Sequence, residues 1–167
     1  KSGIASREVE FYHGSGELAI MGISNWVRMN GETLRPTRLS KEIVEMYQSE
    51  PERKNFESAW VPKLKECENY VAERTCFIDR NWIDANEHMN NVYYIDLATL
   101  TLPEEMYQQG ECNEFLITYR KAIAYGEQVR CYYGEDGNER TVCIKSEDGI
   151  PSQQAPSPIC CRYRSIC

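Results

Sequence analysis

Apolar and polar residues alternate along several short stretches of the chain, and this alternation predicts strands. Near the N-terminus, residues 6–12 and 17–30 alternate on either side of residues 13–16. That connection reads His-Gly-Ser-Gly, and glycine tolerates the positive φ of tight turns, so we expect a β-hairpin. Further along, the same alternation predicts strands over residues 75–82, 114–122, 128–133 and 140–145.

Two other stretches repeat their apolar residues with helical spacing. A short amphipathic helix is predicted over residues 41–47, with Ser40 as its N-cap. A longer helix is predicted to begin at Asn90 or Asn91, since asparagine is a good N-cap residue. The apolar face of this longer helix is expected to consist of Val92, Ile95, Ala98, Leu102 and Met106.

Prolines mark where regular structure should stop. Pro103 interrupts the longer helix, and Thr101 with Glu104 has the spacing of a capping box, so the helix should kink or restart there. Near the C-terminus, residues 150–158 hold three prolines, which would break any strand.

Composition divides the chain into three parts. Residues 49–74 carry two prolines, many charges and little periodicity, which indicates a linker. This linker separates residues 1–48 from residues 75–167. In the last part, one helix precedes a run of antiparallel strands, which predicts an α+β layer architecture.

Asp84, Asn86 and His88 are spaced two residues apart, directly before the longer helix. In an extended backbone, their carboxylate, amide and imidazole would project on one side and meet. The same residue types also bond their own backbone in turns, so a plain turn is the alternative. The helix start at Asn90 and Asn91 offers amides that face incoming negative charge, such as the oxygen of a carbonyl under attack.

Residues 84–91 resemble the D-x-N-x-H-x-N-N signature of the acyl-acyl-carrier-protein thioesterases, which are built from two hot dog domains in one chain. Residues 24–35 are similar to a run S-x-W-V-x-M-N-x-x-T-R, which this family places late in its first hot dog domain. The resemblance continues at Tyr94, Ile95, Tyr119, Arg120 and Lys121.

This resemblance implies a hot dog fold for residues 75–167, in which a long helix is wrapped by a curved antiparallel sheet. Residues 1–48 would be the C-terminal part of a first hot dog domain, so we expect the chain to be N-terminally incomplete. The implied activity is release of free fatty acid from acyl-acyl-carrier protein, which ends fatty acid elongation. The implied setting is the cytoplasm, or the plastid stroma in a plant; no metal or cofactor is implied, and the fold is compatible with a homodimer.

By resemblance, Asp84, Asn86 and His88 are the catalytic residues. Asp84 would attack directly or through an activated water, and the sequence leaves both routes open. Asn86 would orient the carboxylate or the water, and His88 would hold the acyl carbonyl or assist proton transfer. The helix start at Asn90 and Asn91 would polarise the carbonyl oxygen.

One departure from the family bears on this activity. In plant members the run Tyr-Arg-Arg continues with a Glu, which is assigned a catalytic role, and then a Cys, whereas Ala122 and Ile123 stand here. Other functions therefore stay open. The alternatives are a thioesterase that hydrolyses acyl- or aroyl-coenzyme A, a non-catalytic acyl-binding or carrier-binding module, and a purely structural α+β domain.

The net charge of −7 is unevenly distributed. Residues 1–65 hold ten Lys and Arg against nine Asp and Glu, whereas the remaining residues hold nine against seventeen. This balance disfavours nucleic-acid binding, which needs a concentrated basic face. A local basic patch can still dock an acidic carrier protein, and a scattered solvated surface is the alternative. The candidates for this patch are Arg28, Arg35, Arg38, Lys41, Arg53, Lys54, Lys63 and Lys65.

Several classes of protein are disfavoured by the remaining features. No stretch approaches the roughly 18 apolar residues of a membrane span. The chain begins with Lys and shows no signal-peptide pattern, so its targeting cannot be read. Metal binding is not expected, and free thiols in a reducing compartment are the preferred interpretation, because five of the eight cysteines are scattered without C-x-x-C spacing: Cys67, Cys76, Cys112, Cys131 and Cys143.

Overall fold

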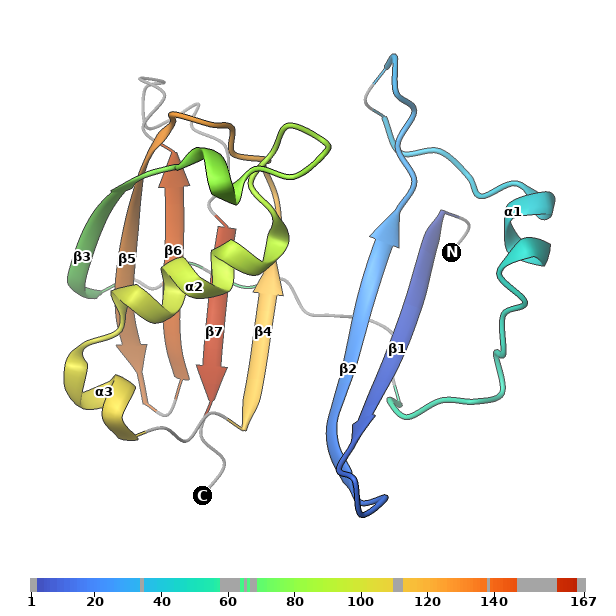
Figure 1. Cartoon of the computed structure of the whole chain (residues 1–167), viewed down its shortest axis with the longest axis horizontal. Helices are drawn as coiled ribbons and strands as arrows, with labels where there is room; N and C mark the ends of the chain where they lie inside the picture. Colours follow the sequence, from blue (N-terminus) through green and yellow to red (C-terminus); the bar gives the residue numbers. More distant parts are fainter. Residues whose placement is uncertain are drawn as a thin grey trace. The chain divides into compact units, whose positions relative to one another are not determined.

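Contacts within the chain divide the computed structural model into two units, residues 1–62 and residues 63–167 (Figure 1). The structure describes residues 3–33, 35–57, 64, 66, 69–109, 113–137, 139–146 and 159–164. Among these described residues, no helix has both the length and the hydropathy needed to cross a bilayer.

The first unit begins with the predicted β-hairpin, which is confirmed. β1 (Ile4–Tyr12) pairs antiparallel with β2 (Leu18–Val27). In the connecting turn, the His13 N–H donates to the carbonyl of Glu17 at 2.8 Å. Gly16 takes a φ of 86° there, a conformation that glycine adopts without strain.

β2 is shorter than predicted because the chain turns at Asn30. The side-chain oxygen of Asn30 accepts the N–H groups of Glu32 at 3.0 Å and of Thr33 at 2.8 Å. An asparagine that binds nearby backbone in this way favours a turn over a strand. The chain then folds back, and Met29 forms an isolated antiparallel bridge with Pro36.

The predicted short helix is also confirmed. α1 (Lys41–Met46) starts after Ser40, whose hydroxyl accepts the N–H of Ile43 at 3.4 Å. An N-cap of this kind satisfies one of the donors that a helix leaves unpaired at its start.

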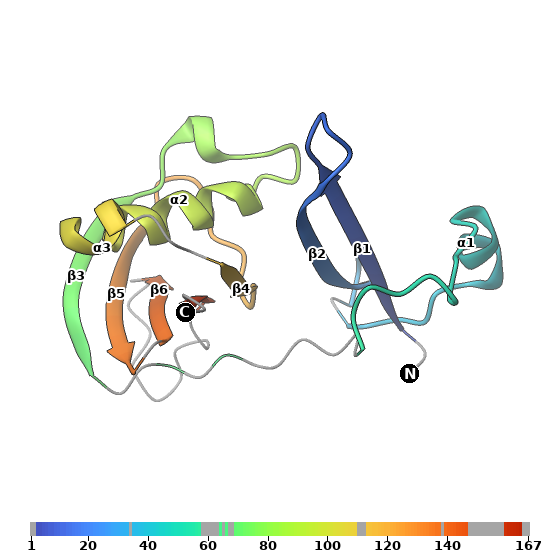
Figure 2. The ribbon, with the colours of Figure 1, turned by 90° about the horizontal axis from the view of Figure 1, so that it is seen from below.

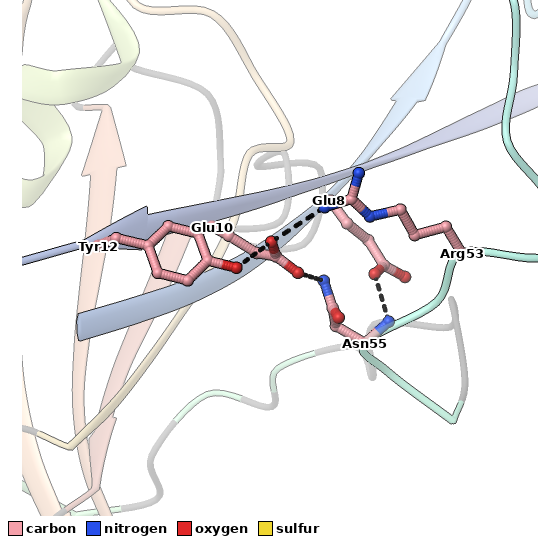
Figure 3. Close-up of polar contacts among 5 residues, drawn as sticks. All are labelled: Glu8, Glu10, Tyr12, Arg53 and Asn55. Carbon is pink, nitrogen blue, oxygen red and sulfur yellow. Dashed lines mark hydrogen bonds and ion pairs between the residues drawn. The ribbon is translucent and has the colours of Figure 1, made fainter. Parts of the chain in front are cut away.

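A polar cluster fastens the segment after α1 to β1 (Figure 3). Glu8 and Glu10 project from the same face of β1, as expected for residues two apart in a strand. The backbone N–H of Asn55 donates to Glu8 at 2.7 Å, and its side-chain amide donates to Glu10. Arg53 lies 3.4 Å from the same Glu10 carboxylate, which also accepts the Tyr12 hydroxyl at 2.6 Å. Glu10 is therefore the centre of the cluster.

Acidification is expected to release this cluster. Hydrogen bonds from Tyr12 and Asn55, with the charge of Arg53, hold the pKa of Glu10 below its ordinary value of 4.5. A depressed folded pKa adds stability above pH 4.5, and this stability is lost as the pH falls through the lower folded value. The Asn55 side-chain amide signals, followed by NMR, should therefore titrate below pH 4.5.

The same titration in two variants tests the assignment. Glu10→Gln should abolish the titration of the Asn55 amide signals, whereas Glu17→Gln, which removes a carboxylate from the hairpin turn, should preserve it. A midpoint at or above pH 4.5 in the unmodified protein would contradict the role given to Glu10.

The second unit is a five-stranded antiparallel sheet crossed by one helix. The strand order is β3-β5-β6-β7-β4. Figure 1 shows α2 (Asn91–Thr101) lying across the sheet, and Figure 2 shows the strands curving around it. The strands are β3 (Tyr70–Phe77), β4 (Glu114–Thr118), β5 (Gln128–Asp136), β6 (Glu139–Ser146) and β7 (Ile159–Arg164).

The predicted bounds of β3 and β4 are wrong. β3 begins at Tyr70, inside the predicted linker, and ends at Phe77 instead of residue 82. A 3-10 turn, η1 (Arg80–Trp82), takes the place of its expected second half, because the Asp79 carboxylate caps the N–H of Arg80 at 2.6 Å. β4 likewise ends at Thr118, four residues before the predicted end at 122.

The C-terminal strand was not predicted. The proline-rich residues 150–158 lie outside the described part of the chain, but β7 follows them and pairs with both β6 and β4. Its Cys161 is fully buried. β7 therefore completes the core of the sheet.

The predicted apolar face of α2 is correct in part. Ala98 is buried, and Leu102 and Met106 pack against the core, but Val92 is 60% exposed and Ile95 is 36% exposed. The helix instead buries Tyr94 and Leu97 beside Ala98. Two polar groups on the buried face find backbone partners, which permits this rotation: Thr101 donates to the Leu97 carbonyl at 2.7 Å, and Tyr94 accepts the N–H of Ile123. The helix packs through Tyr94, Leu97 and Ala98 onto Val129, Cys131, Tyr133, Val142, Ile144 and Cys161.

The helix restarts after Pro103, as predicted, but without the capping box. α3 (Glu104–Gln109) begins directly after this proline, whose carbonyl accepts the N–H of Met106 at 2.9 Å. Thr101 is the last residue of α2, and its hydroxyl is used within that helix. It therefore does not cap α3.

Four of the described cysteines carry free thiols, in agreement with the preferred interpretation. Burial raises the pKa of the Cys131 thiol to about 12, and burial also raises the pKa of Cys161. These thiols therefore stay protonated and act as small apolar core residues. The free cysteines are Cys76, Cys131, Cys143 and Cys161.

Candidate active site

Asp84 to His88 form a turn, so the extended backbone considered from the sequence is wrong and the turn is correct. Ile83 and Met89 pair as an antiparallel bridge, and between them the Asp84 N–H donates to the His88 carbonyl at 2.9 Å. Asp84 stabilises the turn, since its carboxylate accepts the N–H of Asn86 at 2.8 Å. The sequence thus folds here by local side-chain bonding.

The turn still brings the three predicted catalytic side chains to one pocket. Asp84 is partly buried, whereas Asn86 and His88 are exposed at the pocket rim. The Asn86 side-chain amide lies 3.4 Å from the second Asp84 oxygen. Within the described residues, no hydrogen bond joins the His88 imidazole to Asp84. The pocket is lined by Asp84, Asn86, His88, Met89, Asn91, Tyr94, Tyr119, Arg120, Lys121 and Ala122.

The helix start lies beside this turn, as predicted. Asn90 is the N-cap of α2, and its side-chain oxygen accepts the N–H of Val92 at 3.0 Å. Asn91 is the first residue of the helix and lines the pocket. The structure thus gives Asn90 a capping bond and brings Asn91 to the site. Their role at a carbonyl oxygen stays a prediction.

Residues 119–122, which follow β4, form the facing wall. The Tyr119 hydroxyl donates to the Asn91 carbonyl at 3.1 Å, which fastens this wall to the first turn of α2. Burial raises the pKa of Tyr119 to about 12, so this phenol stays neutral. Arg120 donates to the Leu64 carbonyl at 3.1 Å. Asp84 is the only carboxylate among the pocket residues, which also include Arg120 and Lys121.

A backbone bridge joins the two walls at Ile123. The Met89 N–H donates to the Ile123 carbonyl at 2.7 Å. On the other side of the same residue, the Ile123 N–H donates to the Tyr94 hydroxyl at 3.3 Å. The Tyr94 ring meets the Tyr119 ring edge-on at 5.4 Å between centroids. Sequence reasoning did not place Tyr94 in the site, although it lies on the helix face that also carries Leu97.

Glu127 does not supply the carboxylate that Ala122 lacks. One Glu127 oxygen accepts the Ala124 N–H at 3.0 Å, and the other accepts the Ser146 hydroxyl at 2.5 Å. Both oxygens therefore hold the turn before β5, and Glu127 is not a pocket residue.

Comparison with known proteins shows which family the chain resembles. Residues 76–158 match the family described as acyl-ACP thioesterase C-terminal domain. Oleoyl-acyl carrier protein thioesterase 2 of Arabidopsis thaliana, a chloroplastic protein, is 28% identical over 120 residues, which cover 64% of this chain and 31% of that protein. The palmitoyl-acyl carrier protein thioesterase of Cuphea hookeriana is 28% identical over 111 residues, which cover 64% of this chain and 27% of that protein.

Solved structures agree with this match. An acyl-ACP thioesterase from Bacteroides thetaiotaomicron shares 20% identity and a TM-score of 0.76, covering 98% of this chain and 63% of that one. The 12:0-ACP thioesterase from Umbellularia californica is 17% identical with a TM-score of 0.77, and the match covers 98% of this chain and 62% of that one. These likenesses confirm an α+β hot dog fold. The chain spans about a third of the length of its curated Arabidopsis relatives, at 31% and 34%. Residues 76–158 therefore correspond to the C-terminal domain of the acyl-ACP thioesterases, and the chain is similar to these proteins in sequence and in fold.

Proposed function

We propose that the protein hydrolyses acyl-acyl-carrier-protein thioesters and releases free fatty acid. The observation that carries this proposal is that Asp84, Asn86 and His88 line one pocket in a chain similar to the acyl-ACP thioesterases. Acyl carrier protein is the proposed partner because the relatives are named for oleoyl- and palmitoyl-acyl carrier protein. The proposed setting is the cytoplasm, or the plastid stroma in a plant.

The pocket residues suit the steps of thioester hydrolysis. Asp84 activates a water or attacks the acyl carbon itself, and the Asn86 amide groups that bind the carboxylate orient it. The amide at Asn91 stabilises negative charge on the carbonyl oxygen. His88, at the rim, holds the carbonyl or passes a proton to the departing thiolate. In sum, water adds hydroxyl to the acyl carbon, the carbon–sulfur bond breaks, and sulfur takes the proton.

We also propose that residues 1–48 are the C-terminal part of a first hot dog domain, and that the linker to a second one, predicted over residues 49–74, ends before β3 begins at Tyr70. The hairpin of the first unit and the similarity of residues 24–35 to the family support this division. The separation of the contacts into two units supports it as well.

Fatty acid release from acyl-carrier proteins and from acyl-coenzyme A tests the activity. We expect the full-length protein to release fatty acid from the carrier-bound substrates, and free carrier protein to compete. Preferential release from coenzyme A, without competition by free carrier, would favour an acyl- or aroyl-coenzyme A thioesterase. Binding of the carrier without any release would favour the non-catalytic module, as Ala122 suggests.

The structure supports part of the proposed carrier-docking patch. The Thr37 N–H donates to the Arg28 carbonyl at 2.8 Å, and the Asn30 N–H donates to the Arg35 carbonyl at 2.9 Å. These bonds fold the chain back on itself, so Arg28, Arg35 and Arg38 extend from one exposed loop. Lys41, Arg53 and Lys54 are also exposed in the first unit, whereas Lys63 and Lys65 lie outside the described residues.

Charge reversal in this loop is expected to weaken use of the carrier-bound substrate. The variant Arg28→Glu/Arg35→Glu should raise the KM for acyl-carrier protein about tenfold at low salt, because surface charges steer association. Its kcat/KM for a small acyl-pantetheine thioester should stay unchanged. Arg7→Glu makes the same kind of change outside the patch and should leave both substrates unaffected. Equal losses on both substrates would contradict carrier docking here.

A further inference from the structure

Tyr94 is a buried phenol at the base of the pocket. It lies in the first turn of α2, is 2% exposed, and lines the pocket with Asp84 and His88. Its ring is fixed on two sides, by the helix and by the edge-on contact with Tyr119. The position of its hydroxyl is therefore well defined relative to the reacting groups.

The hydrogen bond of this hydroxyl leaves its proton available. In the contact with Ile123, the backbone N–H is the donor and the Tyr94 oxygen is the acceptor, at 3.3 Å. A phenol both donates and accepts, and a buried tyrosine hydroxyl usually finds a partner for each function. The Ile123 amide uses the acceptor and thereby directs the O–H bond away from the backbone bridge.

The phenol also stays protonated over the working pH range. Burial raises the pKa of Tyr94, and the nearby charges of Glu127 and Asp84 raise it further, whereas the Ile123 amide lowers it by less than burial raises it. Tyr94 is thus a neutral donor in a pocket where the developing charge of the reaction is negative.

We propose that Tyr94 donates a hydrogen bond from its phenol to the carbonyl oxygen of the bound thioester, where negative charge develops. This role deepens the proposed function and rests on it. The helix-start amide at Asn91 would be the second donor to the same oxygen. Two donors converging on one oxygen are the usual means of stabilising the tetrahedral intermediate of acyl transfer.

Kinetics of Tyr94→Phe test this role when hydrolysis is observed. The variant keeps the ring and removes the donor, so kcat should fall about 100-fold while KM changes little, as for loss of one donor to an oxyanion. Tyr133→Phe is the matched control, because Tyr133 is equally buried and its hydroxyl binds Glu135 at 2.6 Å, away from the pocket. An unchanged kcat in Tyr94→Phe, or an equal loss in the control, would overturn the proposal.

A binding assay gives a result even if the protein hydrolyses nothing. Two unreactive acyl-pantetheine analogues are compared, a ketone with CH2 in place of sulfur, and a thioether that lacks the carbonyl. The unmodified protein should bind the ketone several-fold more tightly, and Tyr94→Phe should lose this preference while binding the thioether normally. If the protein is inactive but still shows this pattern of binding, the proposed hydrolysis is contradicted, whereas the proposed contact of Tyr94 with the carbonyl oxygen is supported. Absence of the preference in the unmodified protein would overturn the Tyr94 contact.

A second variant covers the case in which Tyr94→Phe does not fold, since the Ile123 amide would then lack an acceptor. Replacing Tyr94 with a difluorotyrosine keeps the hydroxyl and makes it a stronger donor. The preference for the ketone should then increase. A preference equal to that of the unmodified protein would argue that the phenol only supports the backbone.

Discussion

Replacing Asp84 with asparagine is expected to lower kcat for acyl-carrier protein by roughly 10²–10⁴-fold, the usual range for a residue that moves a proton in the transition state. Asparagine keeps the side-chain oxygen that accepts the Asn86 N–H, so the turn should persist. The loss should therefore come from the missing negative charge. It is measured as fatty acid release under saturating substrate, with binding of unreactive substrate followed in parallel.

Asp79→Asn is the matched control for this experiment. Asp79 lies five residues upstream, is exposed, and caps the N–H of Arg80 through the same kind of carboxylate bond. It is not among the residues that line the pocket, so this variant should retain full activity. Retained activity in Asp84→Asn would show that the reaction uses another group, and a loss in Asp79→Asn would show that activity responds to the local backbone alone.

Leu97→Ala is expected to reduce the free energy of unfolding of the second unit by about 2–5 kcal/mol, the usual range for removing a large core side chain. Leu97 is fully buried where α2 meets β5 and β6, so the vacated volume cannot be filled by water. The measurement is urea unfolding monitored by circular dichroism. The free energies of unfolding of the variant and the unmodified protein are compared with the same slope m, the dependence of the free energy on urea concentration.

Val92→Ala tests the orientation of the same helix. Val92 is 60% exposed, so truncating it should change the free energy of unfolding by less than about 0.5 kcal/mol. If α2 is oriented as in the structure, Leu97→Ala should lose more free energy of unfolding than Val92→Ala. If α2 buried the face predicted from the sequence, the order should be reversed. A larger loss for Val92→Ala than for Leu97→Ala would support the face predicted from the sequence and contradict the structure.

The rotation of α2 shows what apolar spacing cannot reveal. Val92, Ile95 and Ala98 repeat with helical spacing, and a count of apolar residues favours burial of all three, although only Ala98 is buried. The helix instead buries Tyr94 and Thr101, because each of these side chains finds a backbone partner. The bond of Tyr94 is made with Ile123, about thirty residues away, and the bond of Thr101 is made within the helix. A count of apolar positions takes neither of these two bonds into account.

The sequence motif brings together residues that share one pocket, but it does not give the shape of the site. Asp84, Asn86 and His88 all line the pocket, and their spacing does not decide between an extended backbone and a turn. The turn prevails because Asp84 binds the N–H of Asn86 two residues on. Residues from a distant wall, such as Tyr119, enter the same pocket only through strand order, which spacing along the chain does not encode.

Strand order also fixes when the site can form during synthesis. β4 lies at one edge of the sheet, and its neighbour is β7, which is synthesised after β4, β5 and β6. Until β7 emerges, β4 has no strand of this sheet to pair with, and the wall that follows β4 has no fixed position. The turn at Asp84 and its helix can form much earlier from local contacts. We therefore expect the pocket to be assembled only after β7 has been synthesised, so that nascent chains ending before Ile159 bind no substrate analogue.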